Sequence, residues 1–216
     1  LTRMASWQSL ARKAAHELKN SLTPIRLTVE EMAARQPASP DRAFMDAAVQ
    51  IVVSEIETLE RRVRAFSEFA QEPDVRLEPV DVRVLIGERV AFLGPAFPAT
   101  VFEPNLDDDV PAALADADLL KGVLTNLLQN AAEAAGVGGR VLACLRREGT
   151  HVAIEVHDSG PGLPSEVSAR LFEPAITFKR HGMGLGLSIA KRNALLCGGD
   201  LVLIPGTLGG AAFCVT

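Results

Sequence analysis

The 216-residue chain contains no tyrosine, one tryptophan and only 5% aromatic residues, although 48% of its residues are hydrophobic. Its core must therefore be largely aliphatic. The 22 Lys and Arg residues are fewer than the 27 Asp and Glu residues, and the net charge of −5 argues against a broad nucleic-acid surface, which needs a basic excess. The three cysteines, Cys144, Cys197 and Cys214, are scattered, suit a reducing compartment and form no CxxC or zinc pattern.

The chain also lacks a hydrophobic run of the roughly 20 residues that span a bilayer, and it has no signal peptide. We therefore expect a cytoplasmic location and no membrane contact within this stretch. Because the chain opens on Leu1 rather than Met, we expect a fragment, so that any anchor in the inner membrane would belong to a missing N-terminal part. A Walker A sequence is absent as well.

The first third of the chain has the apolar periodicity of two long helices. From about Thr2 to Gln36, and again from about Asp41 to Gln71, apolar residues step by three and four positions. The turn between them offers Ser39 as a cap for the second helix. The two apolar seams are formed by Leu18, Leu22, Ile25, Val29 and Met32, and by Met45, Val49, Val52, Ile56, Leu59, Val63, Phe66 and Ala70.

A hairpin of two such helices has too little core of its own. We expect residues 1–73 to form a helical domain that dimerises into a four-helix bundle; the alternative is a hairpin packed on its own globular domain. At ~100° per residue, four side chains of the first helix fall on the face opposite the seam. These are His16, Asn20, Thr23 and Leu27.

Residues 74–216 form the second expected domain, because beyond Pro73 and Pro79 the heptads stop and helical segments alternate with strand-like ones. The expected helices lie near Val82–Leu93, Asp118–Ala135 and Leu187–Leu196. The expected strands lie near Thr100–Leu106, Ala112–Ala115, Leu201–Ile204 and Ala211–Val215, together with a hairpin of Arg140–Arg147 and His151–His157. The pattern predicts an α/β domain with a mostly antiparallel sheet.

Two polar motifs of this domain have both a functional and a plain interpretation. Asp158 ends an expected strand and starts the run Asp-Ser-Gly-Pro-Gly, so its carboxylate can accept a hydrogen bond from a base amino group while Gly160 and Gly162 let a backbone pass close by. The alternative is an Asx turn. Asn126 and Asn130 share one face of a helix, and an amide oxygen can ligate Mg²⁺; the alternative is a pair of solvated or capping side chains.

A third motif is glycine-rich. The run Gly182-Met-Gly-Leu-Gly comes just before the expected start of a helix at Leu187. Glycine amides at a helix N-terminus can hold a phosphate group. The spacing is not GxGxxG and no strand precedes it, which disfavours a dinucleotide site; the alternative is a flexible loop.

The order of these motifs resembles that of a known family. The runs that begin at Asn126, Asp158 and Gly182 match its N, G1 and G2 boxes, Leu171-Phe-Glu-Pro matches its F box, and His16-Glu-Leu-Lys-Asn-Ser-Leu-Thr-Pro-Ile matches its H box. The chain therefore resembles a bacterial two-component sensor histidine kinase, most of all the nitrogen-regulation branch. The resemblance implies a dimerisation and phosphotransfer hairpin followed by a Bergerat-type α/β sandwich that binds ATP, as in gyrase, Hsp90 and MutL proteins.

The resemblance also implies roles for three residues of the H box. His16 is the expected phosphoacceptor, and Glu17 is expected to orient its imidazole and accept the Nδ1 proton, leaving Nε2 to attack the γ-phosphate. Asn20 matches the position that places a water for dephosphorylating the partner; the alternative is a solvated polar residue. Ser21 departs from the family, which usually has proline there, so only Pro24 remains to bend this helix.

In the second domain the resemblance implies ATP and Mg²⁺. Asn130 matches the Mg²⁺ ligand and Asp158 the adenine-reading carboxylate. Asn126 stands where ATP-hydrolysing relatives have a glutamate that activates water, and an amide cannot act as that base. Phe172 is expected to pack the ATP lid, and Lys179 is either a charge clamp on the γ-phosphate or a solvated lysine. The expected nucleotide contacts are Asn126, Asn130, Asp158, Gly160, Gly162, Lys179, Gly182, Gly184, Gly186 and Leu187.

We therefore expect a homodimeric histidine kinase core that phosphorylates His16 from ATP and passes the phosphoryl group to an aspartate of a response-regulator receiver domain. Dephosphorylation of that partner would be a further activity. Thr23 and Leu27 are candidates for the docking surface, and the alternative for Leu27 is packing against the ATP domain. A gyrase- or chaperone-type ATPase is disfavoured by Asn126 and by the H box. The remaining alternative is a degenerate kinase that acts only as a scaffold or phosphatase.

Overall fold

The computed structural model describes residues 22–32, 42–70, 74–164, 170–173 and 185–216. Contacts divide the chain into two compact units, and the second comprises Pro73–Glu173 and Gly186–Thr216. Of the described residues, those before Pro73 are helical, and the second unit combines helices with sheets.

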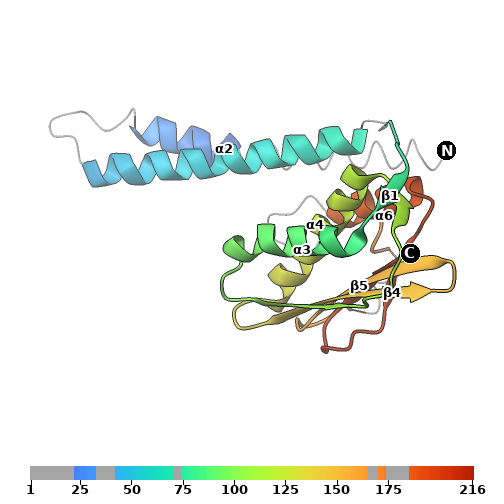
Figure 1. Cartoon of the computed structure of the whole chain (residues 1–216). Helices are drawn as coiled ribbons and strands as arrows, with labels where there is room; N and C mark the ends of the chain where they lie inside the picture. Colours follow the sequence, from blue (N-terminus) through green and yellow to red (C-terminus); the bar gives the residue numbers. More distant parts are fainter. Residues whose placement is uncertain (1–21, 33–41, 71–73, 165–169, 174–184) are drawn as a thin grey trace. The chain divides into compact units, whose positions relative to one another are not determined.

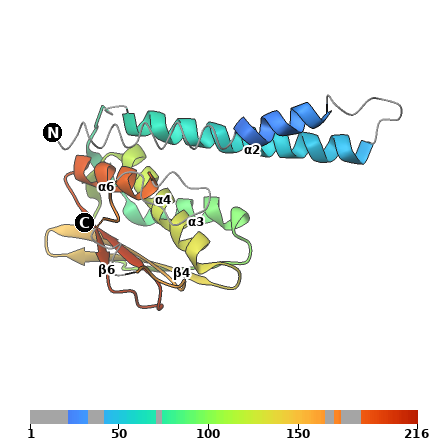
Figure 2. The same cartoon turned by 180° about the vertical axis from the view of Figure 1, so that it is seen from behind.

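The first unit contains two helices that lie side by side, residues 22–32 and α2 (Arg42–Ala70), and α2 agrees with the helix expected from Asp41 to Gln71 (Figures 1 and 2). Part of the predicted seams is exposed to solvent in a single copy of the chain: Leu22, Val29, Met45, Val49 and Ile56. Other seam residues are half-buried: Ile25, Met32, Val52 and Leu59. Leu27, Ile51 and Val53, which lie off the seams, are exposed as well. One copy therefore leaves much of its helical apolar surface uncovered.

The second unit is built on a five-stranded sheet with the strand order β2-β4-β5-β7-β6. In that order the strands are Val101–Leu106, Arg140–Glu148, His151–Asp158, Ala212–Val215 and Leu201–Ile204. The β2–β4 pair is parallel and the other neighbours are antiparallel, which confirms the α/β class and the antiparallel majority. The sequence does not predict that β2 and β4 are parallel. Their relative direction depends on the path of the chain between them, which includes α4 (Ala117–Ala135).

A second, two-stranded sheet pairs β1 (Glu78–Val80) with β3 (Ala113–Ala115) in antiparallel fashion. The sequence predicts β3 but not β1, which has only three residues with a proline at its centre. Such a strand is too short to show alternation, and only its pairing partner defines it.

Three helices cover one face of the five-stranded sheet: α3 (Val82–Leu93), α4 and α6 (Gly186–Leu196) (Figures 1 and 2). A short 3₁₀ turn, Gly94–Ala96, follows α3. Asp81 caps α3 by accepting the N–H of Val84 at 3.1 Å. Asp116 caps α4 and also accepts the N–H of Arg76 at 2.9 Å. These hydrogen bonds lower the pKa of Asp116, and the bond from Arg76 has the largest effect. All three helices lie where the sequence predicts them.

The core of this unit is aliphatic and lies between the helices and the sheet. On β5, Ile154 and Val156 belong to it, whereas Glu155 and His157 alternate to the opposite face of the sheet. Its most deeply buried apolar side chains include Ile86, Val123, Leu124, Leu127, Leu128, Val141, Leu145, Val156 and Leu201. This packing of α4 against β5 fixes the end of β5, where Asp158 stands, relative to the polar face of α4.

No helix in the part of the chain that the structure describes is both long and apolar enough to cross a membrane.

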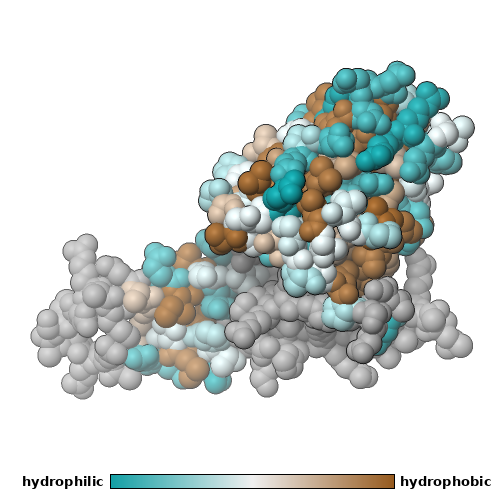
Figure 3. Space-filling view, turned by 90° about the horizontal axis from the view of Figure 1, so that it is seen from below, coloured by the Kyte–Doolittle hydropathy of each residue, from teal (hydrophilic) through white to brown (hydrophobic). Residues whose placement is uncertain are grey.

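Figure 3 shows the α/β unit from the side of its sheet that carries no helix. Hydrophobic and hydrophilic residues are interspersed over the coloured part of that face.

Candidate nucleotide-binding site

Two of the predicted motifs meet where α4 and α6 pack together. Gly186 begins α6 and lies directly against the polar face of α4: a Cβ added there would stand 2.9 Å from Asn126 Oδ1 and 3.8 Å from Asn130 Nδ2. The side chain of Asn126 is held by its own helix, because Nδ2 donates to Gly122 O at 3.0 Å. Glycine at position 186 thus lets the N-terminus of α6 approach both amides.

Asp158 is 4% exposed and is held by the backbone around it. Its Oδ1 accepts the N–H of Gly160 at 2.8 Å and that of Ala211 at 3.3 Å. Within the described residues no hydrogen bond reaches Oδ2, so one carboxylate oxygen is fixed and the other is left to accept a bond from a ligand. Burial raises the pKa of this carboxyl, and the two N–H bonds partly offset that effect.

The glycines after Asp158 allow close backbone contacts. A Cβ at Gly160 would stand 2.6 Å from Ala134 O in the last turn of α4, and 2.8 Å from Asp158 Oδ1. Gly162 has a φ of +75°, in the left-handed region that favours glycine. Gly160 thus lets the chain pass close beside the carboxylate, and Gly162 supplies a backbone conformation that other residues rarely adopt.

The segment from Gly206 to Ala211 supplies a contact that sequence reasoning missed. Gly210 N donates to Asp158 O at 3.1 Å, and Asp158 N donates to Ala211 O at 3.0 Å. A Cβ at Gly210 would overlap Asp158, at 2.0 Å from Oδ1 and 2.5 Å from the backbone oxygen. In the sequence, the run from Gly206 to Phe213 resembles the closing G3 region of the same family, but that resemblance does not name Asp158 as the partner.

Two other predicted residues lie at the edge of this site. Leu187, in the first turn of α6, is half-buried and packs against the core, so only its backbone is available for a nucleotide. Phe172 packs edge-on against Phe213, with ring centroids 6.4 Å apart, and Lys191 Nζ lies 5.1 Å from the Phe172 centroid. Phe172 thus packs against β7 and α6, and the lid residues on either side of it, against which it was expected to pack, lie outside the described residues. Six predicted site residues lie outside the described residues: His16, Glu17, Asn20, Lys179, Gly182 and Gly184.

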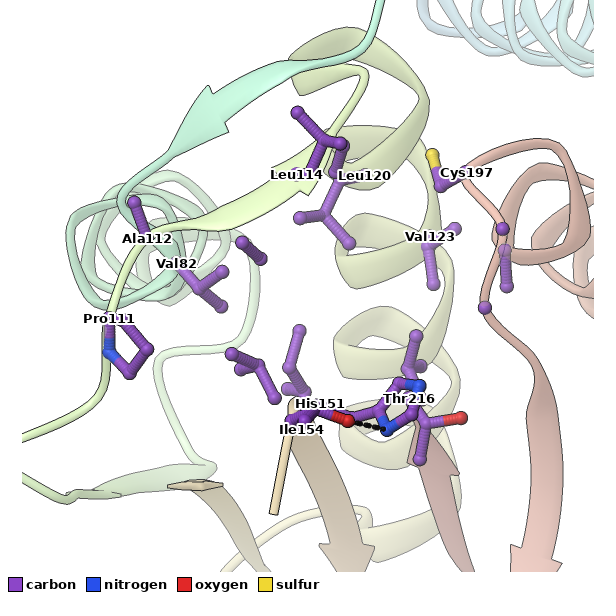
Figure 4. A pocket seen from close by; sticks show the side chains of 18 residues that line it. Val82, Pro111, Ala112, Leu114, Leu120, Val123, His151, Ile154, Cys197 and Thr216 are labelled. Carbon is purple, nitrogen blue, oxygen red and sulfur yellow. Dashed lines mark hydrogen bonds between the residues drawn. The ribbon is translucent and has the colours of Figure 1, made fainter. Parts of the chain in front are cut away.

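A separate cavity of about 370 Å³ lies at the opposite end of β5 (Figure 4). It opens between β3, α3, α4 and the start of β5, and its lining includes Leu114, Val82, Leu120 and Ile154. None of the predicted nucleotide residues lines it. Its walls are mostly apolar, and no Lys or Arg is among the residues that line it.

The arrangement around Asp158 can bind a nucleotide of particular chemistry. The free carboxylate oxygen suits an amino group on a base, and the N-terminal end of α6 suits the negative charge of phosphates. Between them, α4 presents the two amides of Asn126 and Asn130. An amide cannot act as a general base, so neither of these side chains can direct water at a bound nucleoside triphosphate.

The fold and the site agree with a family match: residues 115–216 match the model of the histidine kinase-, DNA gyrase B- and HSP90-like ATPases. The chain is 33% identical over 210 residues to the nitrogen regulation protein NtrY of Azorhizobium caulinodans, covering 93% of this chain and 27% of that protein. It is 32% identical over 201 residues to the sensory histidine kinase/phosphatase NtrB of Rhizobium leguminosarum, covering 85% of this chain and 51% of that protein. The predicted resemblance to sensor histidine kinases, and to their nitrogen-regulation branch, is confirmed.

Solved structures agree with this assignment. The histidine kinase ThkA in complex with the response regulator TrrA superposes with a TM-score of 0.78 at 25% identity, over 99% of this chain and 62% of that one. The catalytic domain of ThkA alone gives a TM-score of 0.60 at 29% identity, over 65% of this chain and 93% of that one. The motifs predict a protein-histidine kinase, and the proteins to which the chain is similar are named as histidine kinases.

Replacing Gly186 with alanine is expected to weaken ATP binding roughly fivefold, the equivalent of about 1 kcal/mol for one disturbed polar contact. The new Cβ would stand 2.9 Å from Asn126 Oδ1, so the amide must move away from its place beside the N-terminus of α6. Calorimetric titration with a nonhydrolysable ATP analogue measures the change. Gly87→Ala is the matched control, because a Cβ at this position of α3 meets nothing within 4 Å. Equal affinities for the two variants would show that the contact does not shape the site.

Proposed function

We propose that the chain is the catalytic core of a sensor histidine kinase, which transfers the γ-phosphoryl group of ATP to His16 and then to an aspartate of a response-regulator receiver domain. The observation that carries the proposal is the site in which Asp158, the two amides of α4 and the start of α6 come together. Because ATP is the donor, the proposal places this core in the cytoplasm.

On the donor side, Asp158 Oδ2 would accept a hydrogen bond from the adenine amino group, while Oδ1 stays on the N–H groups of Gly160 and Ala211. The phosphates would extend toward the start of α6, in front of Asn126 and Asn130. Asn126 cannot take a proton from water, so the triphosphate would be protected from hydrolysis until the acceptor arrives. Lys179, Gly182 and Gly184 would complete the phosphate contacts.

A magnesium ion fits the chemistry of this donor set. Asn130 is half-buried one helical turn from Asn126, and its amide oxygen is a hard ligand of the kind that Mg²⁺ accepts together with water and phosphate oxygens. When bound, the ion would neutralise phosphate charge during transfer. Asn130 is the residue of this chain that we propose to hold it.

On the acceptor side, His16 Nε2 would attack the γ-phosphorus, forming the P–N bond as the bond to the ADP oxygen breaks. Glu17 would accept the Nδ1 proton, which removes the positive charge that attack creates on the ring. Asn20, one helical turn on, would position a water for dephosphorylation of the regulator. Thr23 is half-buried and Leu27 is exposed, so Leu27 is the better candidate for a docking contact.

A homodimer is supported by the apolar surface of the helical unit. Leu22, Val29, Val49 and Ile56 are 42–52% exposed in one copy, although they follow the predicted seams. Pairing two hairpins into a four-helix bundle would bury them. A response-regulator partner is supported by the ThkA–TrrA complex, to which the whole chain is similar in fold.

Incubation with γ-labelled ATP and Mg²⁺ tests the proposal. We expect label on the protein that is labile in acid and stable in base, as a phosphoramidate is, and we expect His16→Ala to abolish it. His151→Ala, which removes an exposed histidine at the start of β5, is the matched control and should label fully.

A second step uses an isolated receiver domain. The label should move from the protein to the receiver, and Asn20→Ala should slow its later loss from the receiver without reducing autophosphorylation. Wild-type protein that binds ATP but takes up no label would replace this proposal with the alternative of a scaffold or phosphatase.

A further inference from the structure

A buried polar cluster lies on the face of the sheet opposite to the one against which the core packs. Cys144 on β4 and His157 on β5 are each 2% exposed, and Glu155 lies between them with its side chain 21% exposed. Cys144 and Glu155 are direct partners in the β4–β5 register, and His157 follows Glu155 by two residues on the same face. Buried polar side chains on the outer face of a sheet require partners.

The three side chains converge on one point. Each of them offers one ligand atom, a sulfur, a carboxylate oxygen or an imidazole nitrogen, and these three atoms all lie within 4.8 Å of one another. Among the described residues, these three form the group of His, Cys, Asp or Glu side chains that could hold a metal ion. His157 Nε2 and Glu155 Oε2 are 3.0 Å apart. Ligands on a tetrahedral Zn²⁺ ion, with bonds of roughly 2.0–2.3 Å, stand roughly 3.3–3.8 Å from one another, so only small side-chain movements are needed.

A second buried thiol, that of Cys214, lies nearby but is not part of this cluster. Cys214 lies on the other side of Glu155 in the β5–β7 register, and burial raises its pKa to about 11. The partly exposed Glu155 leaves a path for an ion to enter.

We propose that Cys144, Glu155 and His157 bind one Zn²⁺ ion, with water in the fourth position. The mixture of sulfur, nitrogen and oxygen ligands suits Zn²⁺ and not Mg²⁺ or Ca²⁺, which take oxygen ligands. Binding releases the thiol proton of Cys144 to solvent. This site does not depend on the proposed kinase activity.

The position of His157 couples this site to the nucleotide residues. His157 Nδ1 stands 3.4 Å from the N–H of Thr207, so the ring accepts there and carries its proton on Nε2, in the bond to Glu155. Zn²⁺ at Nε2 moves that proton to Nδ1, where it faces the Thr207 N–H and breaks the contact. Thr207 belongs to the segment whose Gly210 and Ala211 hold Asp158. Zn²⁺ therefore loosens the hold on Asp158, and this consequence rests on the nucleotide site proposed above.

Titration of the nucleotide-free chain with Cd²⁺, followed by the ultraviolet charge-transfer band of a thiolate–cadmium bond, tests the metal site. Competition with Zn²⁺ gives the affinity for Zn²⁺. We expect one equivalent to bind, Cys144→Ser to lose the band, and Glu155→Gln and His157→Asn to weaken binding by at least roughly tenfold. Cys197→Ser and His151→Asn remove a thiol and an imidazole outside the cluster, and they should leave the band and the affinity unchanged.

A band that persists in Cys144→Ser, or no binding by the folded wild type, would overturn the metal site. Glu155 is partly exposed, so Glu155→Gln keeps the test valid if Cys144→Ser does not fold. In a separate titration with a fluorescent ATP analogue, Zn²⁺ should weaken nucleotide binding by at least roughly fivefold in the wild type and not in His157→Asn. Metal binding with unchanged nucleotide affinity would refute the coupling through Thr207.

Discussion

Asp158→Asn is expected to lower the affinity for ATP roughly 10- to 150-fold, the range that corresponds to one hydrogen bond to a charged group. Asparagine has nearly the same shape, and its Oδ1 can keep the bonds from Gly160 and Ala211. Those two donors fix the orientation of the amide, so its NH₂ group must point where Oδ2 now lies. A donor would then face the amino group of adenine. Titration with a nonhydrolysable ATP analogue measures the loss.

The same variant should change which purine is preferred. Guanine presents a carbonyl oxygen where adenine has its amino group, so the asparagine NH₂ suits it better, and the ratio of GTP to ATP affinity should rise. Asp109→Asn, on an exposed acid, is the matched control and should leave both affinities unchanged. If Asp158→Asn bound ATP as tightly as the wild type, Asp158 would not be the residue that recognises the base.

The stability of Asp158→Asn should move in the opposite direction from its affinity. Burial raises the pKa of Asp158 above its ordinary value of 3.8, so the folded state holds this proton more tightly than the unfolded state does. The resulting stabilisation is complete below the unfolded pKa and is lost as the pH rises through the folded pKa. Near neutral pH we therefore expect nucleotide-free Asp158→Asn to melt at or above the wild-type temperature, and the difference to vanish in acid. A melting temperature well below that of the wild type at neutral pH would contradict this expectation.

Gly210→Ala is expected to destabilise the α/β unit by about 3 kcal/mol or more and to abolish ATP binding with it. The new Cβ would overlap Asp158 Oδ1 at 2.0 Å, Asp158 O at 2.5 Å and Gly160 N at 2.7 Å. Two of these atoms belong to the backbone, so no side-chain rotation relieves the overlap. Chemical denaturation, followed by circular dichroism, measures the free energy of unfolding.

Gly149→Ala separates this steric effect from backbone strain. Gly149, in the turn between β4 and β5, has a φ of +62°, but a Cβ there meets nothing within 4 Å. Its replacement should cost only about 1–2 kcal/mol and leave ATP binding intact. Equal destabilisation by the two substitutions would mean that Gly210 is not held against Asp158.

Local patterns predicted the helices and most strands, because each depends on neighbouring residues. The expected helix Val82–Leu93 has the bounds of α3, and the alternation of Val152, Ile154 and Val156 identified β5. The strand β1 was missed because it is a strand only through its pairing with β3, which lies more than 30 residues away in the chain. The parallel partner of β2 was missed for the same reason, since no local pattern encodes strand direction.

The candidate site divides in the same way. Asp158 and the amides of α4 were found because their residue types and order carry the information. The role of Gly210 was not, because its contact with Asp158 joins residues far apart in the chain. Cys144, Glu155 and His157 form no spacing motif, and only the register of the β4–β5 hairpin brings them together. Contacts set by register are invisible to a search for motifs.

The two outermost strands of the five-stranded sheet limit how copies of this protein can aggregate. β6 has only four residues and is followed by Pro205, and β2 contains Pro104, which has no N–H to offer a neighbouring strand. Short or proline-containing edges are poor templates for adding a further strand. The α/β unit should therefore resist edge-to-edge polymerisation even when its concentration is high. Self-association would then depend on the exposed apolar residues of the helices, and in the homodimer proposed above their pairing would be complete with two copies.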